Sequence, residues 1–268
     1  MRIGSLFSGI GGLELGLEWA GVGHTVWQCE VNPWCRGILA SHWPDVRRFE
    51  DIKTMGIEDE IPAVDLICGG FPCQDISAAG HRAGLEGERS GLFYELIRIL
   101  RVVRPRWVVL ENVANILAMP EVLGPVLSEL HQSGYDGEWS VISAADVGAP
   151  HLRRRWFFIG WRVADSDGAR LREERGRSGL EQLHALGRGL TLQARPQTFP
   201  PRPGDLRAWE RLPVDDQPAI CRSVDGVSEW LGDIDEVEAL KGLGNAVVPQ
   251  VAQVVGRRLM ELKAEVCV

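Results

Sequence analysis

Short apolar runs alternate with helix-like segments over about the first 160 residues, and this alternation limits the fold more than any other feature of the sequence. Strands are expected at residues 2–7, 24–29, 64–68, 107–110, 139–143 and 155–161. Helices are expected at residues 13–20, 32–41, 92–103 and 120–133, and a terminal helix at residues 249–262. Strands separated by helices indicate an α/β fold with a doubly wound, mainly parallel sheet.

Glycine and proline mark several of these boundaries. Gly21 or Gly23 is expected to end the first helix, because glycine readily adopts the left-handed conformation that follows helix ends. Pro33 and Pro249 fit the first turns of their helices, where proline needs no backbone N–H.

The sequence changes in character after Trp161. Residues 162–211 are rich in Arg, Gly and Pro and show weak periodicity, which indicates a loop-rich unit. We therefore expect one main domain of residues 1–161 and 237–268, interrupted by a small irregular region of residues 162–236.

Charge is distributed unevenly along the chain, although the net charge is −8. Between Arg153 and Arg211 there are 13 Arg and no Lys against seven Asp and Glu, which gives +6; the remaining residues carry 16 positive and 30 negative charges, or −14. A basic segment on an acidic body is a candidate phosphate-contacting surface, because guanidinium pairs with phosphate and guanine in a bidentate manner. A solvated, Arg-rich loop explains the same composition.

The composition, 45% apolar and 25% charged residues, is typical of a soluble globular protein. No apolar run approaches about 18 residues and the N-terminus lacks the features of a signal peptide, so we expect a cytoplasmic protein without a membrane span. The six cysteines show no C-x-x-C spacing, which favours reduced thiols and no metal site.

The first candidate site is the turn at residues 7–12, FSGIGG, between the first strand and the first helix. Its glycines let the backbone approach a ligand closely. Glu30 ends the next strand, 18 residues after Gly12, where a carboxylate can hold a ribose diol as in nucleotide cofactor sites. The pattern also fits a structural turn, and by itself it does not separate adenosylmethionine from a dinucleotide.

Cys73 is the second candidate. It follows the strand at residues 64–68 through two glycines and a proline, which places it at the carboxyl edge of the sheet, where ligands bind. A thiol with a lowered pKa is a nucleophile for an electron-poor ring carbon. A lone cysteine near a strand end can equally be a small buried hydrophobe.

Glu111 is the third candidate, directly after the apolar strand at residues 107–110. Its apolar neighbours predict a raised pKa, and such a carboxyl group can donate a proton to a ring nitrogen. A helix-start or loop carboxylate would have the same position in the sequence.

Together and in order, these motifs resemble those of the cytosine-C5 DNA methyltransferases. The resemblance rests on FSGIGG at residues 7–12, Glu30, Asp51, FPCQ at residues 71–74, ENV at residues 111–113, RRR at residues 153–155 and GNAVVP at residues 244–249. The matching stretches cover roughly residues 1–161 and 237–262. The family has a Rossmann-like fold that binds S-adenosylmethionine, so the main domain would be catalytic and residues 162–236 would recognise the target.

The resemblance implies methyl transfer to cytosine in double-stranded DNA. Cys73 would attack C6 of a flipped-out cytosine, and Glu111 would hold or protonate N3. C5 would then take the methyl group from S-adenosylmethionine. Loss of the C5 proton and elimination of Cys73 would release 5-methylcytosine and S-adenosylhomocysteine, with no metal ion.

The motifs also imply roles for further residues. The implied cofactor site consists of Phe7, Gly9, Gly11, Gly12, Glu30, Asp51, Ile52, Pro72, Asn245 and Ala246. The implied contacts to the base and DNA are Gln74, Asn112, Arg153 and Arg155, and the two arginines would also be catalytic, with Cys73 and Glu111, by supporting the flipped base. The segment after residue 237 would complete the cofactor domain, with its helix packed against the N-terminal helix.

Three features depart from the family pattern. His151 stands where Gln usually precedes the paired arginines, and Val31 stands where many members carry a large residue that stacks on adenine. The Arg and Leu-Thr motif that closes the recognition domain does not match residues 212–225. Residues 162–236 are also few, as in compact phage-type members, so the recognised DNA sequence cannot be read from the chain.

The family implies a monomer that acts on duplex DNA, with a cognate restriction endonuclease as a candidate partner. Three other functions stay open. A nicotinamide-dependent oxidoreductase explains the glycine turn and Glu30, but not Cys73 with Glu111. A tRNA cytosine methyltransferase shares the motifs, because one branch of the family acts on tRNA. A catalytically silent DNA-binding protein would keep the fold, but drift would be expected to erode the catalytic residues, which are intact.

Overall fold

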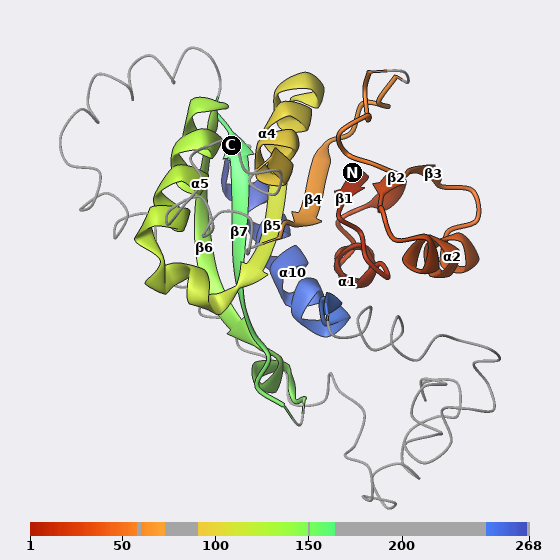
Figure 1. Cartoon of the computed structure of the whole chain (residues 1–268). Coiled ribbons are helices and arrows are strands. Elements are labelled where there is room, and N and C mark those ends of the chain that lie inside the picture. The colour runs from red at the N-terminus through yellow and green to blue at the C-terminus, as the bar shows by residue number, and fades with distance from the viewer. Residues whose placement is uncertain (58–59, 73–90, 150, 164–244, 267–268) are drawn as a thin grey trace, which may run out of the picture.

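The computed structural model describes residues 1–57, 60–72, 91–149, 151–163 and 245–266 (Figure 1). The strands are β1 (Arg2–Leu6), β2 (His24–Cys29), β3 (Arg47–Phe49), β4 (Leu66–Gly70), β5 (Trp107–Val113), β6 (Tyr135–Ser143) and β7 (Arg154–Arg162). The helices are α1 (Gly12–Trp19), α2 (Pro33–His42), α4 (Gly91–Val103), α5 (Pro120–Gln132) and α10 (Pro249–Val266), with 3₁₀ helices η2 (Ala114–Ala118) and η3 (Ala144–Val147).

The described strands form one sheet in the order β3-β2-β1-β4-β5-β7-β6. Neighbouring strands from β3 to β5 are parallel, whereas β7 is antiparallel to both β5 and β6. Successive strands are added on both sides of β1, because β2 and β3 lie on one side of it and β4 and β5 on the other. The expected doubly wound, mainly parallel α/β sheet is confirmed.

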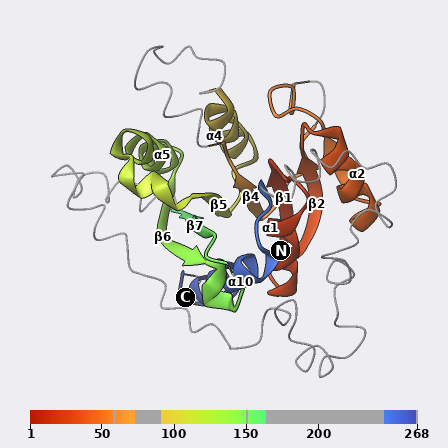
Figure 2. The same cartoon turned by 60° about the horizontal axis from the view of Figure 1, so that its bottom comes forward.

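Helices cover both faces of this sheet (Figure 2). One apolar core includes side chains of α4 and α5, and the core on the other face includes those of α1 and α10. Gly16 lets α1 and α10 approach closely, since a Cβ there would lie 2.2 Å from the carbonyl oxygen of Pro249. The expected packing of the terminal helix against the N-terminal helix is confirmed.

Local sequence signals set several element ends. Gly21 follows α1 with a φ of 74°, so it is the glycine that ends this helix. The Asn32 side chain caps α2 by accepting hydrogen bonds from the backbone N–H groups of Trp34 and Cys35, and Pro33 occupies the first turn. Pro249 begins α10, as its sequence predicts.

Some strand boundaries differ from those expected. β5 continues to Val113, because β7 pairs with it until Arg155 lies opposite Val113. Glu111 therefore lies inside β5. The prediction that it follows the strand was wrong. β4 is shifted to Leu66–Gly70, and β6 begins at Tyr135 rather than at residue 139. The short, basic β3 was not expected, since parallel pairing with β2 forms it and no alternating pattern marks it.

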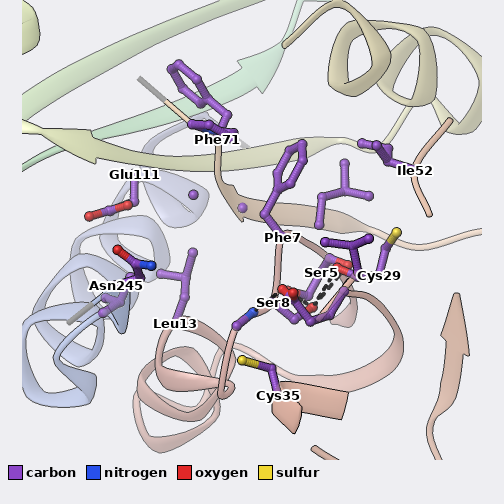
Figure 3. A pocket seen from close by; sticks show the side chains of 18 of the residues that line it. Ser5, Phe7, Ser8, Leu13, Cys29, Cys35, Ile52, Phe71, Glu111 and Asn245 are labelled. Carbon is purple, nitrogen blue, oxygen red and sulfur yellow. Dashed lines mark hydrogen bonds between the residues drawn. The ribbon is translucent and has the colours of Figure 1, made fainter. Parts of the chain in front are cut away.

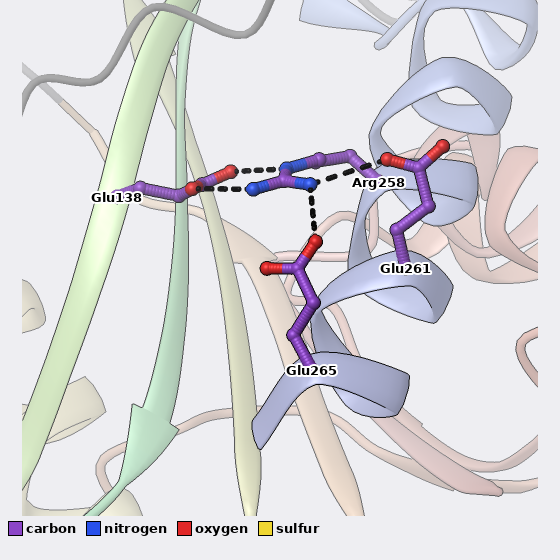
Figure 4. A network of polar contacts seen from close by, with 4 residues as sticks. All are labelled: Glu138, Arg258, Glu261 and Glu265. Atoms are coloured by element: carbon purple, nitrogen blue, oxygen red, sulfur yellow. Dashed lines mark hydrogen bonds and ion pairs between the residues drawn. The ribbon is translucent and has the colours of Figure 1, made fainter. Parts of the chain in front are cut away.

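An ion-pair network ties α10 to β6 at the edge of the sheet (Figure 4). Arg258 Nε donates to Glu138 Oε1 at 2.8 Å, and Nη2 donates to Oε2 at 3.1 Å. The Glu138 side chain is only 9% exposed. Nη1 of the same arginine contacts Glu261 and Glu265, each at 3.2 Å. A buried bidentate pair of this kind fixes the orientation of α10 relative to the sheet.

Within the described ranges, no helix is long and apolar enough to cross a membrane, and no cluster of three or more His, Cys, Asp or Glu could hold a metal ion. The irregular region expected at residues 162–236 lies outside the described residues except for its first two positions. Cys73 and Gln74 also lie outside them.

Candidate active site

A cavity of about 820 Å³ opens at the carboxyl ends of β1, β2, β4 and β5 (Figure 3). This edge is where open α/β sheets bind ligands. The expected site residues that line the cavity are Phe7, Gly9, Gly12, Glu30, Asp51, Ile52, Pro72, Glu111, Asn112, Arg155, Asn245 and Ala246. Four strand ends and the segment before α10 thus meet in one place.

The turn after β1 presents its backbone to the cavity. Phe7, Gly9 and Gly11 have φ values of 55°, 56° and 87°, a left-handed conformation that glycine adopts without strain and phenylalanine does not. The Ser8 N–H donates to the Cys29 carbonyl at 3.1 Å, and the Gly11 N–H donates to the Ser8 carbonyl at 2.9 Å. The turn is therefore held against the end of β2.

Glu30 joins this turn to the start of α2. Its Oε2 accepts a hydrogen bond from the Gly9 N–H and its Oε1 from the Asn32 N–H, both at 2.8 Å. Each carboxylate oxygen has about two acceptor sites, so Glu30 can hold the turn and still accept from a ligand hydroxyl. Farther along the same wall, Asp51 Oδ1 accepts from the Lys53 N–H at 2.9 Å.

Residues 245–247 close the cavity on the side of α10. A Cβ at Gly12 would lie 2.1 Å from the Val247 carbonyl oxygen, so only glycine lets this segment approach the turn. Figure 3 shows the side chains of Asn245 and Glu111 on the same side of the cavity. The C-terminal segment therefore completes a wall that begins at the N-terminus of the chain.

Glu111 is a buried carboxyl group on β5. Arg155 Nε contacts its Oε1 at 2.9 Å. Gly70, on the adjacent strand, makes room for it, because a Cβ there would lie 2.8 Å from Glu111 Oε2. Burial raises the pKa of Glu111 to about 7, although Arg155 and Arg153 lower it in part. The raised pKa expected from the sequence is confirmed, and the group can hold or release a proton near neutral pH.

Asn112 holds the chain that leads to Cys73. Its Nδ2 donates to the Phe71 carbonyl at 3.0 Å, and its Oδ1 accepts from the Val113 N–H at 2.8 Å. The Asn112 side chain is buried, as is that of Phe71. The backbone is thus fixed just before Pro72, which is the last described residue ahead of Cys73.

Two expected site residues have other surroundings. Gly11 is the N-cap of α1, and a Cβ there would lie 2.4 Å from the Trp43 ring, so it does not line the cavity. Arg153 precedes β7, and its Nη2 donates to the Ala246 carbonyl at 2.5 Å. Arg153 therefore contacts the C-terminal segment and does not line the cavity itself.

Glu14, a fully buried residue of α1 that lines the cavity, was not expected from the sequence. Within the described ranges, no group donates a well-formed hydrogen bond to either carboxyl oxygen. Burial raises the pKa of Glu14 to about 7, although the nearby Ser5 and Ser8 hydroxyls lower it in part. A signal was available, because Glu14 lies beside Leu13 and Leu17 on the buried side of the helix.

The fold and the cavity define a class: an open α/β protein with a glycine turn on one side of its ligand site and a buried carboxyl group of raised pKa on the other. The family model described as C-5 cytosine-specific DNA methylase matches residues 1–180. The chain therefore belongs to the C-5 cytosine-specific DNA methylase family.

Relatives of known name are methyltransferases. The chain is 37% identical over 161 residues to the type II methyltransferase M2.BsuMI of Bacillus subtilis, which covers 58% of this chain and 40% of that protein. It is 33% identical over 197 residues to M.NgoFVII of Neisseria gonorrhoeae, covering 71% and 52%. A mutant of Spodoptera frugiperda DNMT2 superposes with a TM-score of 0.49 at 22% identity, covering 60% of this chain and 50% of that one. The chain spans about half the length of the curated relatives it matches.

Proposed function

We propose that this protein is a DNA (cytosine-5-)-methyltransferase that acts on a flipped-out cytosine through a covalent adduct of Cys73. The observation that carries the proposal is Glu111, a buried carboxyl with a pKa of about 7 that pairs with Arg155 at the cavity. The neighbouring Asn112 holds the segment that leads to Cys73. Membership of the family and the names of the relatives support the same reaction.

The cavity suits S-adenosylmethionine, which would supply an electrophilic methyl group on a sulfonium. Its volume lies within the roughly 300–1,000 Å³ of small-molecule sites. A Cβ at Gly9 would meet no atom within 4 Å, so the backbone there borders open space. Glu30 and Asp51 are suited to accept hydrogen bonds from the ribose hydroxyls and the adenine amine. Phe7, Gly12, Ile52, Pro72, Asn245 and Ala246 would form the remaining walls.

Glu111 would act on N3 of the cytosine. A carboxyl group with a pKa of about 7 can share its proton with a ring nitrogen and take it back later. Arg155 would orient the carboxyl group through the contact at Oε1. A proton at N3 withdraws electron density from the ring, which makes C6 more electrophilic.

Cys73 would supply the nucleophile. Its thiolate forms a bond to C6, and the electron pair of the C5–C6 double bond moves toward C5. C5 would then take the methyl group that S-adenosylmethionine would supply, with S-adenosylhomocysteine as the leaving group. A base removes the C5 proton, the double bond re-forms, and Cys73 leaves as thiolate. Covalent catalysis divides a difficult substitution into easier steps.

Duplex DNA is the proposed substrate. Flipping the target cytosine out of the duplex costs a few kcal/mol, which contacts between the base and the pocket can offset. We assign target recognition to residues 162–236, with the Arg-rich stretch on the phosphates. The relatives' names support a cognate restriction endonuclease as a partner, and we propose that the chain acts as a cytoplasmic monomer.

Bisulfite sequencing of DNA from cells that express the protein tests this proposal. We expect 5-methylcytosine at one recurrent sequence with the wild-type chain and with the thiol control Cys267→Ser, and none with Cys73→Ala. The tRNA of the same cells is sequenced in parallel. Methylation confined to tRNA would overturn the assignment of DNA, and methylation by Cys73→Ala would overturn the nucleophile.

A further inference from the structure

Arg153 links two walls of the cavity that come from distant parts of the chain. Its Nη2 donates to the carbonyl oxygen of Ala246, 93 positions later in the sequence, at 2.5 Å. Ala246 lines the cavity next to Asn245. A hydrogen bond from a charged guanidinium is among the stronger kinds, so this contact can fix the position of the segment.

The backbone of Arg153 is in an unusual conformation that its neighbours enforce. Its φ is 27°, in a region that residues with long side chains rarely adopt. The hydroxyl of Ser143 and the N–H of Ala144 both donate to the carbonyl of Leu152, directly before it. Strain that the surrounding structure imposes is typical of functional positions.

The segment that Arg153 holds is itself part of the cofactor wall. The carbonyl of Val247 lies so close to Gly12 that a Cβ there would be 2.1 Å from it. The turn, residues 245–247 and the start of α10 therefore form one packed unit. A displacement of Ala246 would change the shape of the wall against which the cofactor is proposed to lie.

Arg153 also acts on Glu111 through its charge. Arg155 and Arg153 are the charged groups whose fields lower the pKa of this carboxyl. Arg153 is partly buried, and its own pKa is lowered by burial and by Arg155, whereas Glu111 raises it. Loss of the Arg153 charge should therefore raise the pKa of Glu111 further.

We propose that Arg153 is a positioning residue that couples the cofactor side of the cavity to the base side, because it holds Ala246 while Arg155, two residues later, contacts Glu111. This inference rests on the proposed function. Because the coupling between two sites is reciprocal, a cofactor that contacts residues 245–247 would, through Arg153, also restrain the start of β7, from which Arg155 reaches Glu111. Glu111 would then be held in position for proton transfer before the cytosine enters the cavity.

The test compares Arg153→Met, Arg153→Lys and the matched control Arg154→Met, which removes an exposed arginine from the next position. Affinity for S-adenosylhomocysteine is measured by calorimetry without DNA. The pKa of Glu111 is followed by carboxyl ¹³C NMR, with Glu111→Gln to assign the signal. We expect Arg153→Met to weaken binding about tenfold or more and to raise the pKa of Glu111. Arg153→Lys, which keeps the charge, should restore most of the pKa, and Arg154→Met should change neither.

Each contrary result overturns a defined part. Wild-type affinity in a folded Arg153→Met protein would show that the arginine does not hold the cofactor wall. Weaker binding with an unchanged Glu111 pKa would show that Arg153 holds Ala246 without affecting Glu111, which would overturn the coupling. If the wild-type chain binds neither S-adenosylmethionine nor S-adenosylhomocysteine, the proposed function fails, and the coupling fails with it. Thermal unfolding of each variant identifies any loss that is due to misfolding.

Discussion

Replacing Glu14 by Gln should change how the stability of this protein depends on pH. The Glu14 side chain is fully buried, and burial raises its pKa from 4.5 to about 7. Between these values the folded chain binds a proton that the unfolded chain releases, so stability falls as pH rises. The difference is worth about 3 kcal/mol, most of it lost between about pH 5 and pH 8.

Urea unfolding followed by tryptophan fluorescence measures this effect. Glu14→Gln cannot ionise, so relative to wild type its free energy of unfolding should improve by about 2.5 kcal/mol as pH rises from about 5 to 8. Glu111 is present in both proteins and cancels in the difference. Glu121→Gln, which removes an exposed carboxyl on α5, should stay parallel to wild type. A parallel curve for Glu14→Gln would refute the view that its carboxyl is neutral in the folded chain.

Three further predictions concern the site and its support. Gly70→Ala should reduce methyl transfer at least about tenfold by displacing the Glu111 carboxyl, whereas Gly37→Ala, at an exposed position of α2 with open space around its Cβ, should keep full activity and stabilise α2 by about 1 kcal/mol; equal activities would contradict the role of Gly70. Arg258→Met should lower the free energy of unfolding by about 3 kcal/mol because it leaves Glu138 buried and unpaired, and Glu261→Gln by less than about 1 kcal/mol, as urea titration can show. Glu111→Gln should slow transfer about a hundredfold or more and remove the fall in rate above about pH 7 that ionisation of Glu111 produces in wild type; retention of that fall would assign it to another group.

The parts of the fold that local chemistry determines could be read from the sequence. Alternating strands and helices predicted the doubly wound sheet, and Pro33 and the pair Gly21 or Gly23 marked helix ends, because helix ends depend on a few adjacent residues. The extension of β5 past Glu111 could not be predicted, since it depends on pairing with β7 some 45 residues later.

The candidate site shows the same division. The glycine turn and Glu111 were identified because each follows a predicted apolar strand, although β5 continues past Glu111. The environment of Glu14 was missed, because a carboxylate in an amphipathic helix is normally solvated, and its burial follows from the packing of α1 close to Ser5 and Ser8. The contact between Arg153 and Ala246 joins residues 93 positions apart, and no local pattern indicates such a pair.

The attack of Cys73 on cytosine is tested most directly with duplex DNA in which 5-fluorocytosine replaces cytosine throughout, so that the target sequence need not be known. Fluorine at C5 cannot leave as a proton does, and the bond between sulfur and C6 should then persist. After incubation with S-adenosylmethionine, we predict a denaturation-resistant adduct that mass spectrometry places on the peptide containing Cys73, and none with Cys73→Ala. An adduct that survives in Cys73→Ala, or one on another cysteine, would contradict the covalent role of Cys73.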